Sequence, residues 1–338
     1  MIDHAARHLC PPARPSLCVV VDVEEEFDWR RPFRASNTGC EAIGRLAQAQ
    51  AIFARHGVTP CYLVDHPVAA DEQARKLIGP WLAAGACDIG AQLHPWVTPP
   101  HEEVVCTRNS FPHNLDPDLE KRKLATLMEV IREGFGAYPR AYKAGRYGLG
   151  DHSVDTLTGF GFEIDTSVVP HWTYRGAGGG RDFIGLPNQP FWLSPRQHLL
   201  ELPFSVVLTG PLGRRMPLAL ERLIFSPTGI RQSMPGILSR LGLASRIKLS
   251  PEGSSLAEMK QAVDALLSRD RHYLCLSFHS PSLLPGCTPY VRTDADLEDF
   301  LDRLDRILAY IIGQRGVTPT GVFELRRQLM TAPAALAA

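Results

Sequence analysis

The chain has 338 residues, of which 44% are hydrophobic and 21% charged, a composition typical of a folded globular protein rather than a disordered or fibrous one. Its 36 basic and 36 acidic residues give a formal net charge of zero, which indicates neither a nucleic-acid partner nor an anionic membrane surface. No apolar run reaches the ~18–20 residues of a membrane span, and residues 1–15 lack the apolar centre of a signal peptide, so we expect a cytoplasmic protein.

Apolar patterning predicts alternating strands and helices over the first half of the chain. The run LCVVVDV at residues 17–23 is typical of a strand buried on both faces. Residues 116–133 have helical spacing, with Asp116 as N-cap and Pro117 at the first helical position. The other expected strands are 58–64, 87–94, 140–144 and 162–168, and the other expected helices are 41–55, 71–84 and 151–159. Pro80 is expected to interrupt its helix.

The alternation stops between residues 169 and 250 and then resumes. Glycines and prolines indicate irregular structure in this stretch, which contains one strand signal at 198–208. Alternation returns with an expected helix at 254–268, a strand at 272–278 and a long amphipathic helix at 294–312. The pattern predicts an α/β fold with a parallel sheet, right-handed crossovers and a large irregular insertion around 169–250.

Two carboxylates leave the first long strand on one face. Because side chains alternate along a strand, Asp22 and Glu24 point the same way, ~6.6 Å apart along the backbone. Such a pair can divide the roles of general base and ligand of a hard metal ion. The alternative is a solvated acidic loop, which is the interpretation we prefer for Glu26 and Asp28. Active sites of parallel α/β folds form at these strand ends, which favours a functional role for Asp22.

A second polar cluster ends the strand at 87–94. Gln92 and His94 share one face, and the indole of Trp96 could form a pocket wall. The alternative for His94 is a structural histidine, and the position after a buried strand makes the two interpretations comparable.

Two later strand ends carry a cation and an acid. Residues 143–148 place Arg146 between two glycines, where it could pair with a buried carboxylate, and an ordinary strand-to-helix turn is the alternative. Asp165 follows the next strand and could equally be a helix N-cap.

His279 leaves the strand at 272–278 much as Asp22 leaves the strand at 17–23. A histidine held in apolar surroundings at a strand end is a good general acid, and the alternative is a core histidine bonded to backbone.

Several well-known patterns are absent from the sequence. It contains no GxxxxGK[ST], GxSxG or HExxH motif. The eight cysteines form no Cys-x-x-Cys pair, so we expect most of them to be reduced and buried.

The order and positions of these clusters resemble those of the polysaccharide deacetylase family, and of its WalW-like branch most closely. The resemblance is carried by the stretches VVVDVEEEFDW, DIGAQLHPWVTPP, NSFPHNL, YKAGRYG, FEIDTSVVP and FHSPSLLPGCTPYVR. It implies a single distorted (β/α)7 barrel domain over residues 17–325, with residues 1–16 as an N-terminal extension and 326–338 as a flexible tail.

The resemblance also implies a reaction, which is hydrolysis of an N- or O-acetyl group on a sugar, assisted by a divalent metal that is usually zinc. Asp22 matches the family's catalytic base, Glu24 its metal-binding acid and His279 its catalytic acid. Asp165 lies where the family has a further acid. The implied partner is an acetylated carbohydrate.

The second motif departs from the family pattern, which supplies two metal-binding histidines in an HxxxH frame. Gln92 and Trp96 stand at those positions, and His94 is the nearest histidine. The expected metal ligands are therefore Glu24, His94 and Gln92, and glutamine is a poor ligand for zinc. Other candidates for the third ligand are Asp22, Glu25 and His113.

The third motif leaves the orientation of the base open. Register from the preceding tyrosine favours Lys143 as the partner of Asp22, whereas residue type favours Arg146, which can bind a carboxylate bidentately. The expected sugar-stacking aromatics are Trp29, Trp96, Tyr147 and Trp172, for which burial in the core is the default interpretation.

Three functional hypotheses follow from the sequence. The leading one is a metal-assisted deacetylase in polysaccharide metabolism. The second is a degenerate barrel that binds carbohydrate or a partner without turnover. The third is a metal-independent amide hydrolase that keeps Asp22 and His279.

Overall fold

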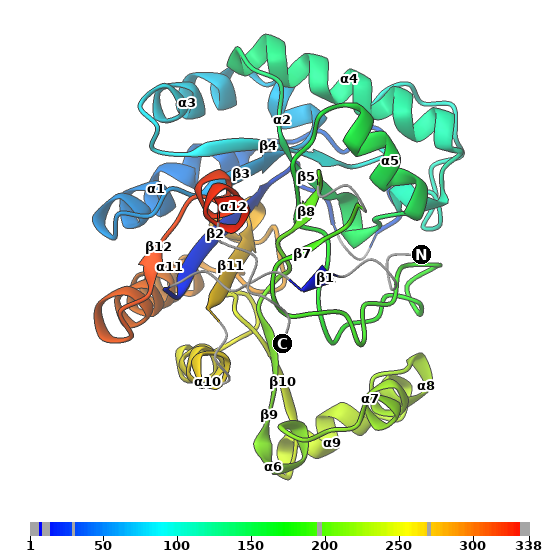
Figure 1. Cartoon of the computed structure of the whole chain (residues 1–338). Helices are drawn as coiled ribbons and strands as arrows, with labels where there is room; N and C mark the ends of the chain where they lie inside the picture. Colours follow the sequence, from blue (N-terminus) through cyan, green and yellow to red (C-terminus); the bar gives the residue numbers. More distant parts are fainter. Residues whose placement is uncertain (1–6, 9–13, 29–30, 195–197, 269–271, 332–338) are drawn as a thin grey trace.

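The computed structural model describes residues 7–8, 14–28, 31–194, 198–268 and 272–331. Seven parallel strands form its main sheet, in the order β8-β6-β5-β4-β3-β2-β11. They are β2 (Ser16–Val23), β3 (Cys61–Val64), β4 (Asp88–Leu93), β5 (Ala141–Ala144), β6 (Ile164–Asp165), β8 (Leu200–Glu201) and β11 (Tyr273–His279). The sheet is curled into a half-barrel, in agreement with the expected distorted (β/α)7 architecture (Figure 1).

Three short strands extend this sheet. β12 (Thr318–Pro319) pairs in parallel with the start of β2, while β7 (Phe191–Trp192) and β1 (Arg7–His8) add antiparallel pairs beyond β8. The remaining gap in the barrel is bridged by the insertion, because the backbone of Ser205 and Leu249 hydrogen-bonds with β11.

Helices pack on the outside of the curled sheet, and Figure 1 shows α1, α3, α4 and α11 around it. They are α1 (Leu46–Arg55), α2 (His66–Ala70), α3 (Glu72–Ala83), α4 (Pro117–Phe135), α5 (Asp151–Gly159), α10 (Leu256–Leu267), α11 (Asp294–Leu308) and α12 (Val322–Thr331). The 3-10 helix η2 (Glu41–Arg45) precedes α1 and the π-helix η6 (Ala309–Gln314) follows α11. Asp116 caps α4 through the backbone N–H groups of residues 118 and 119, as expected.

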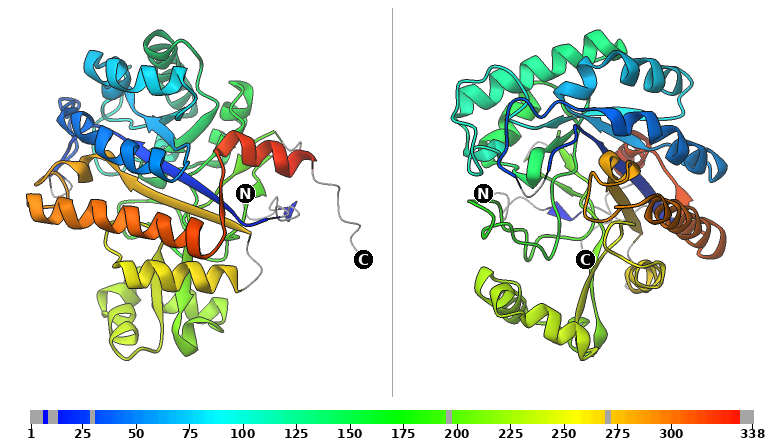
Figure 2. Two further views of the ribbon diagram at one scale, coloured as in Figure 1. Left: turned by 90° about the vertical axis from the view of Figure 1, so that its left-hand side faces the viewer. Right: turned by 180° about the vertical axis from the view of Figure 1, so that it is seen from behind.

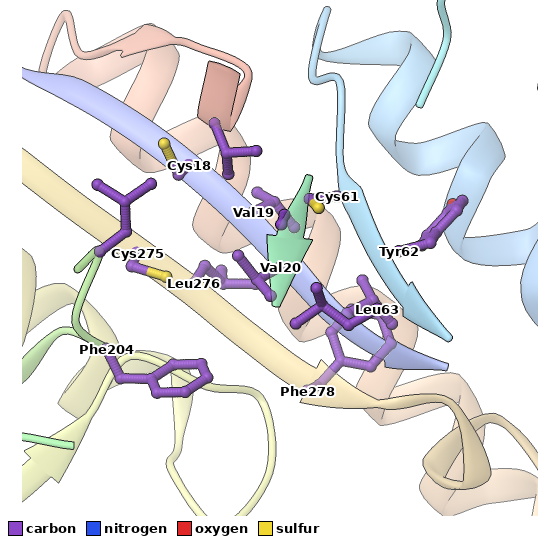
Figure 3. Packing of buried hydrophobic residues seen from close by; sticks show 14 of the residues in the cluster. Cys18, Val19, Val20, Cys61, Tyr62, Leu63, Phe204, Cys275, Leu276 and Phe278 are labelled. Atoms are coloured by element: carbon purple, nitrogen blue, oxygen red, sulfur yellow. The ribbon is translucent and has the colours of Figure 1, made fainter. Parts of the chain in front are cut away.

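The core forms around β2, whose eight residues are all buried. Figure 3 shows its side chains between those of β3 and β11. The labelled residues of this packing are Cys18, Val19, Val20, Cys61, Tyr62, Leu63, Phe204, Cys275, Leu276 and Phe278. β2 and β11 run side by side in register, with His279 opposite Asp22, so the two polar ends are held at one edge of the core.

The insertion is more regular than expected. A hairpin of β9 (Val206–Thr209) and β10 (Ser245–Lys248) carries four short helices. They are α6 (Gly210–Gly213), α7 (Leu218–Ile224), α8 (Pro227–Arg231) and α9 (Met234–Arg240). Figures 1 and 2 show these helices at the far end of the hairpin, to one side of the parallel sheet.

Three local predictions were wrong. The single strand expected at 198–208 is two strands in different sheets, since Pro203 between them cannot donate to a ladder. Helix α3 continues through Pro80, where the loss of one N–H near the helix end is tolerated and the Pro80 carbonyl still accepts from Ala84. The expected flexible tail is helical to Thr331, with Leu329 buried, and residues 332–338 lie outside the described part. Among the described residues no helix is both long and apolar enough to cross a bilayer.

Candidate active site

The carboxyl ends of the parallel strands open into a cavity of about 480 Å³. Its lining comes from the ends of β2, β4, β5 and β11 and from the insertion. The charged lining residues are Asp22, Glu24, Lys143, Arg146, Arg246, Lys248, Glu252 and His279. The aromatic ones are Phe27, Phe33, Tyr147, Trp172, Tyr174 and Tyr290. The cavity therefore collects groups that lie far apart in sequence, including the first and last predicted catalytic residues.

Asp22 and His279 face each other in this cavity. Their Cα atoms are partners across β2 and β11, and His279 Nε2 lies 3.1 Å from Asp22 Oδ2. The other oxygen, Asp22 Oδ1, has no hydrogen-bond partner among the described residues, although the side chain is buried. A buried carboxylate oxygen that lines a cavity and lacks a donor is well placed to accept a proton from a bound water.

Glu252 orients His279 from the opposite side. Its Oε2 lies 2.8 Å from His279 Nδ1, and its Oε1 accepts the backbone N–H of His279 and the hydroxyl of Ser282. Burial alone would lower the pKa of His279, but the carboxylates of Glu252, Glu24 and Asp22 outweigh burial and raise it to about 9. Burial opposes ionisation of Glu252 as well, yet the His279 charge and these hydrogen bonds hold its pKa below the ordinary value. His279 is therefore protonated at neutral pH and can donate from Nε2.

Lys143 is the cation that pairs with Asp22. Its Nζ contacts Asp22 Oδ2, and both side chains are about 2% exposed. Arg146, the other candidate that the sequence left open, does not take this role, because it donates to Ser110 Oγ and to the Thr107 carbonyl and stacks over Phe111. The physical reason is position: Lys143 lies within β5, whereas Arg146 follows the strand end with a positive φ of 53°.

The three predicted metal ligands also meet, but as a hydrogen-bonded triad. Gln92 Nε2 donates to Glu24 Oε2 at 2.9 Å and lies 3.0 Å from His94 Nε2. His94 Nδ1 lies 2.8 Å from Glu25 Oε2, and Trp96 Nε1 donates to Glu25 Oε1. Burial lowers the pKa of His94 to about 4, so a neutral ring donates from Nδ1 to Glu25 and accepts at Nε2 from Gln92.

Burial also raises the pKa of Glu24 in this triad and of the two acids next to it, Glu25 and Asp65. It raises the pKa of Glu24 well above its ordinary value, and it raises that of Glu25 to about 7 against the hydrogen bonds from Asp65 and Trp96. Asp65 is buried behind them, where it accepts the backbone N–H of Glu25 and caps α2. Its pKa is raised well above the ordinary value by burial and by the neighbouring Glu25 charge.

Among the described residues, two groups of side chains bring possible metal-ligand atoms within 4.8 Å of one another: Asp22, Glu24 and His279, and Glu25, Asp65 and His94. A catalytic zinc takes three protein ligands in an open geometry. Of the three predicted ligands, Glu24 and His94 are the good zinc donors, and the amide nitrogen of Gln92 lies between them and donates to both.

Lys143 already places a positive charge against the first group, since it contacts Asp22. The predicted set of Glu24, His94 and Gln92 therefore does not fit a zinc ion, and the reaction proposed for this site uses none.

Other predicted site residues lie outside the cavity. Asp165 is fully buried, where it accepts the N–H and hydroxyl of Ser167 and lies beside Glu201. Burial raises the pKa of both acids. Trp96 is buried against His94, with ring centroids 4.3 Å apart, and positions Glu25 instead of facing a substrate. His113 bonds the Gly179 carbonyl. Trp29 lies outside the described residues.

Tyr147 and Trp172 do line the cavity, as predicted, and Tyr174 lies between them. The sequence interpretation missed Arg246 and Lys248, which lie at the end of the stretch expected to be irregular, and Glu252, which follows this stretch. One signal could have identified Arg246 and Lys248, and it does not extend to Glu252. In residues 246–249, Ile247 and Leu249 alternate with Arg246 and Lys248, which is the period of a half-buried strand.

Comparison with known proteins finds similarity in structure only. No family model matches the sequence, and no curated protein sequence matches it significantly. A protein assigned as a polysaccharide deacetylase from Mycobacterium smegmatis superposes with a TM-score of 0.52 at 15% identity, over 96% of this chain and 95% of that one. The chain therefore has the fold of that protein.

Two further structures have the same fold. PuuE allantoinase gives a TM-score of 0.53 at 14% identity, covering 94% of this chain and 91% of its own. A protein assigned as a glycoside hydrolase/deacetylase from Parabacteroides distasonis gives 0.62 at 10% identity, covering 96% and 73%. At these identities the likeness concerns the fold alone.

Proposed function

We propose that the chain is a hydrolase of non-peptide carbon–nitrogen bonds that removes the acyl group of an N-acylated sugar without a required metal. The observation that carries this proposal is the 3.1 Å contact between Asp22 Oδ2 and His279 Nε2 in one cavity, with Glu252 behind the histidine. The aromatic wall of Tyr147, Tyr174 and Trp172 supports a sugar substrate, since such rings can stack on one. We also propose that the chain belongs to the WalW-like branch of the polysaccharide deacetylases.

The reaction follows from the positions of the proton-carrying groups. A water next to Asp22 Oδ1 loses a proton to this oxygen as its own oxygen bonds to the acyl carbon. The ammonium of Lys143 can stabilise the negative charge that develops on the acyl oxygen. His279 then gives its Nε2 proton to the leaving nitrogen as the carbon–nitrogen bond breaks. The products are a carboxylic acid and an amine.

The experiment is to measure release of acetate and of free amine from N-acetylated sugars by the purified protein. A panel that includes N-acetylglucosamine and its short oligomers tests the acyl-sugar class. The proposal predicts release that depends on Asp22 and His279 and that continues in the presence of a chelator. Release abolished by the chelator and restored by zinc would instead support the metal-assisted reaction.

The second candidate is a carbohydrate-binding barrel without turnover, and the hydrogen-bonded triad of Gln92, His94 and Glu24 favours it. It predicts sugar binding by calorimetry with no acetate release under any metal condition. The two candidates therefore differ in one measurable quantity, the product formed.

A further inference from the structure

The cavity contains positive charges that the proposed reaction does not use. Arg146, Arg246 and Lys248 line it, and none of them forms an ion pair with a carboxylate within the described part of the chain. The carboxylates of the cavity, in contrast, are Asp22, Glu24 and Glu252, and two of these pair with Lys143 or His279. Cations are thus in excess in the cavity, and two of them, Arg246 and Lys248, come from the insertion.

Arg246 is held rigidly at this side. Its guanidinium lies 3.6 Å from the ring centroid of Trp172 and 4.2 Å from that of Phe225, and Nη1 donates to the His171 carbonyl. Burial lowers its pKa to about 10, so it remains charged at neutral pH. A guanidinium fixed by stacking presents its remaining N–H groups in a planar fork, which suits a carboxylate or a phosphate.

Lys248 lies two residues further along β10, on the same face as Arg246. Its Nζ lies 4.7 Å from the Phe204 ring centroid and 3.3 Å from the hydroxyl of Tyr147. The rings of Tyr147, Tyr174 and Trp172 connect this end to Arg246, with successive centroids 4.9 and 6.4 Å apart. An aromatic wall therefore runs from the acid–base pair toward a guanidinium.

We propose that the substrate carries an anionic group, a carboxylate or a phosphate, which Arg246 and Lys248 bind while the acyl group lies at Asp22 and His279. This inference rests on the proposed function for the location of the reacting bond. It narrows the substrate class from an N-acylated sugar to an acidic N-acylated sugar.

The test measures binding by calorimetry, so that it does not depend on turnover. The probes are N-acetylglucosamine, its 6-phosphate and the corresponding uronic acid. We expect at least one acidic sugar to bind ten-fold or more tightly than the neutral one, and the preferred acid identifies phosphate or carboxylate. Arg246→Gln should remove this preference, whereas Arg214→Gln, an exposed arginine of the same insertion, should keep it.

Equal affinity for charged and neutral sugars, absence of binding to all three, or equal loss in the Arg214→Gln control would overturn the inference. Failure of the proposed function has a different signature, namely selective binding of the acidic sugar without product release.

A different observation concerns the outer part of the insertion, residues 210–244, which we call the 210–244 excursion. Ten large hydrophobic residues are exposed in the described part of the chain, and six of them lie in this excursion. They are Leu218, Leu223, Ile230, Ile237, Leu241 and Leu243. Other apolar residues of the excursion, including Leu220 and Leu238, already pack into a small core with Ile224 and Phe225. The six exposed side chains are therefore not part of the small core that stabilises the excursion.

The same excursion is strongly basic. Its five arginines are all exposed: Arg214, Arg215, Arg222, Arg231 and Arg240. Its one acidic residue, Glu221, is buried and paired with His171. Large apolar side chains next to unpaired arginines are typical of helices that lie in the interface of an anionic membrane.

We infer that the 210–244 excursion docks on an anionic lipid surface. A second copy of the chain is a poorer occupant, because a twofold contact places the patch against itself and brings like charges together. A nucleic acid would match the arginines but leave six large apolar side chains without a partner.

The test is co-sedimentation of the full chain with vesicles of phosphatidylcholine, with and without phosphatidylglycerol. We expect binding only with the anionic lipid and a fall of ten-fold or more in the double variant Leu223→Ser and Leu241→Ser. The matched control is Val104→Ser, which removes an exposed apolar residue outside the excursion and should bind normally. Absence of vesicle binding, tighter binding to duplex DNA, or dimers in light scattering that the double variant abolishes would overturn the inference.

Discussion

Asp22 Oδ2 is approached by two cations, Lys143 Nζ and His279 Nε2, while its Oδ1 has no partner among the described residues. The two oxygens of one carboxylate therefore have different tasks. One is held by charge, which fixes the orientation of the group, and the other is available to a water molecule in the cavity. Removing a partner from such a buried pair is costly, because the remaining charge is left without compensation.

Replacing either member of the acid–base pair should abolish turnover while substrate still binds. We expect Asp22→Asn and His279→Gln to lower kcat by about 10²- to 10⁴-fold, the usual contribution of general acid–base catalysis. The measurement is steady-state release of free amine. His113→Gln serves as the control, because His113 bonds the Gly179 carbonyl outside the cavity. Full activity in either site variant would contradict the assigned roles.

The pH dependence of kcat/KM should follow the ionisation of His279. With a pKa raised to about 9, His279 is protonated through neutral pH and loses its donor proton as the pH rises past that value. We therefore expect kcat/KM to fall on the alkaline side near pH 9. Glu252→Gln removes the first carboxylate that raises this pKa, so the alkaline limb should move to lower pH, whereas the exposed Glu298→Gln should leave it in place. An unchanged limb in Glu252→Gln would exclude His279 as the titrating acid.

At the scale of elements, β2 and β11 place the acid and the base by register. All residues of β2 are buried, and the parallel pairing continues from Ser16 opposite Tyr273 to Asp22 opposite His279. A shift of one residue would turn every side chain of a strand to its other face, so the packing of both strands specifies the site.

The stability of the protein should therefore be sensitive to truncation of a buried side chain of β11. Leu276 has no exposed surface, and Leu276→Ala should lower the free energy of unfolding by about 2–5 kcal/mol through lost burial and a residual cavity. Urea denaturation followed by circular dichroism gives the value. Leu218→Ala, which truncates a leucine with 43% of its surface exposed, should change stability far less. Comparable losses in the two variants would argue against the described packing.

At the scale of the whole molecule, the net charge of zero conceals a strong local asymmetry. Five exposed arginines lie within the 210–244 excursion, while many carboxylates lie elsewhere. The net charge, which gave no indication of an anionic membrane surface, thus averages over regions of opposite charge, and the inferred lipid docking rests on one of these regions. The proposed cytoplasmic location stays a prediction.

Analysis and removal of metal from the purified protein test whether the whole chain binds and needs zinc. We expect elemental analysis to find far less than one zinc per chain and dialysis against a chelator to leave amine release unchanged. The reason is the amide of Gln92, which donates to both Glu24 and His94 where a zinc ion would need their lone pairs. One tightly bound zinc per chain, with activity lost on its removal, would refute this prediction.

Local signals in the sequence were sufficient for the parallel sheet and for the pairing of Asp22 with His279 at one mouth. Buried parallel strands appear as continuous apolar runs, and a polar residue that ends such a run lies at the carboxyl edge of the sheet. Only the tertiary structure decided which cation meets Asp22, that Trp96 and Asp165 lie outside the cavity, and that Glu252 supports His279. These outcomes depend on the directions of side chains from separate elements, and no local pattern in the sequence contains that information.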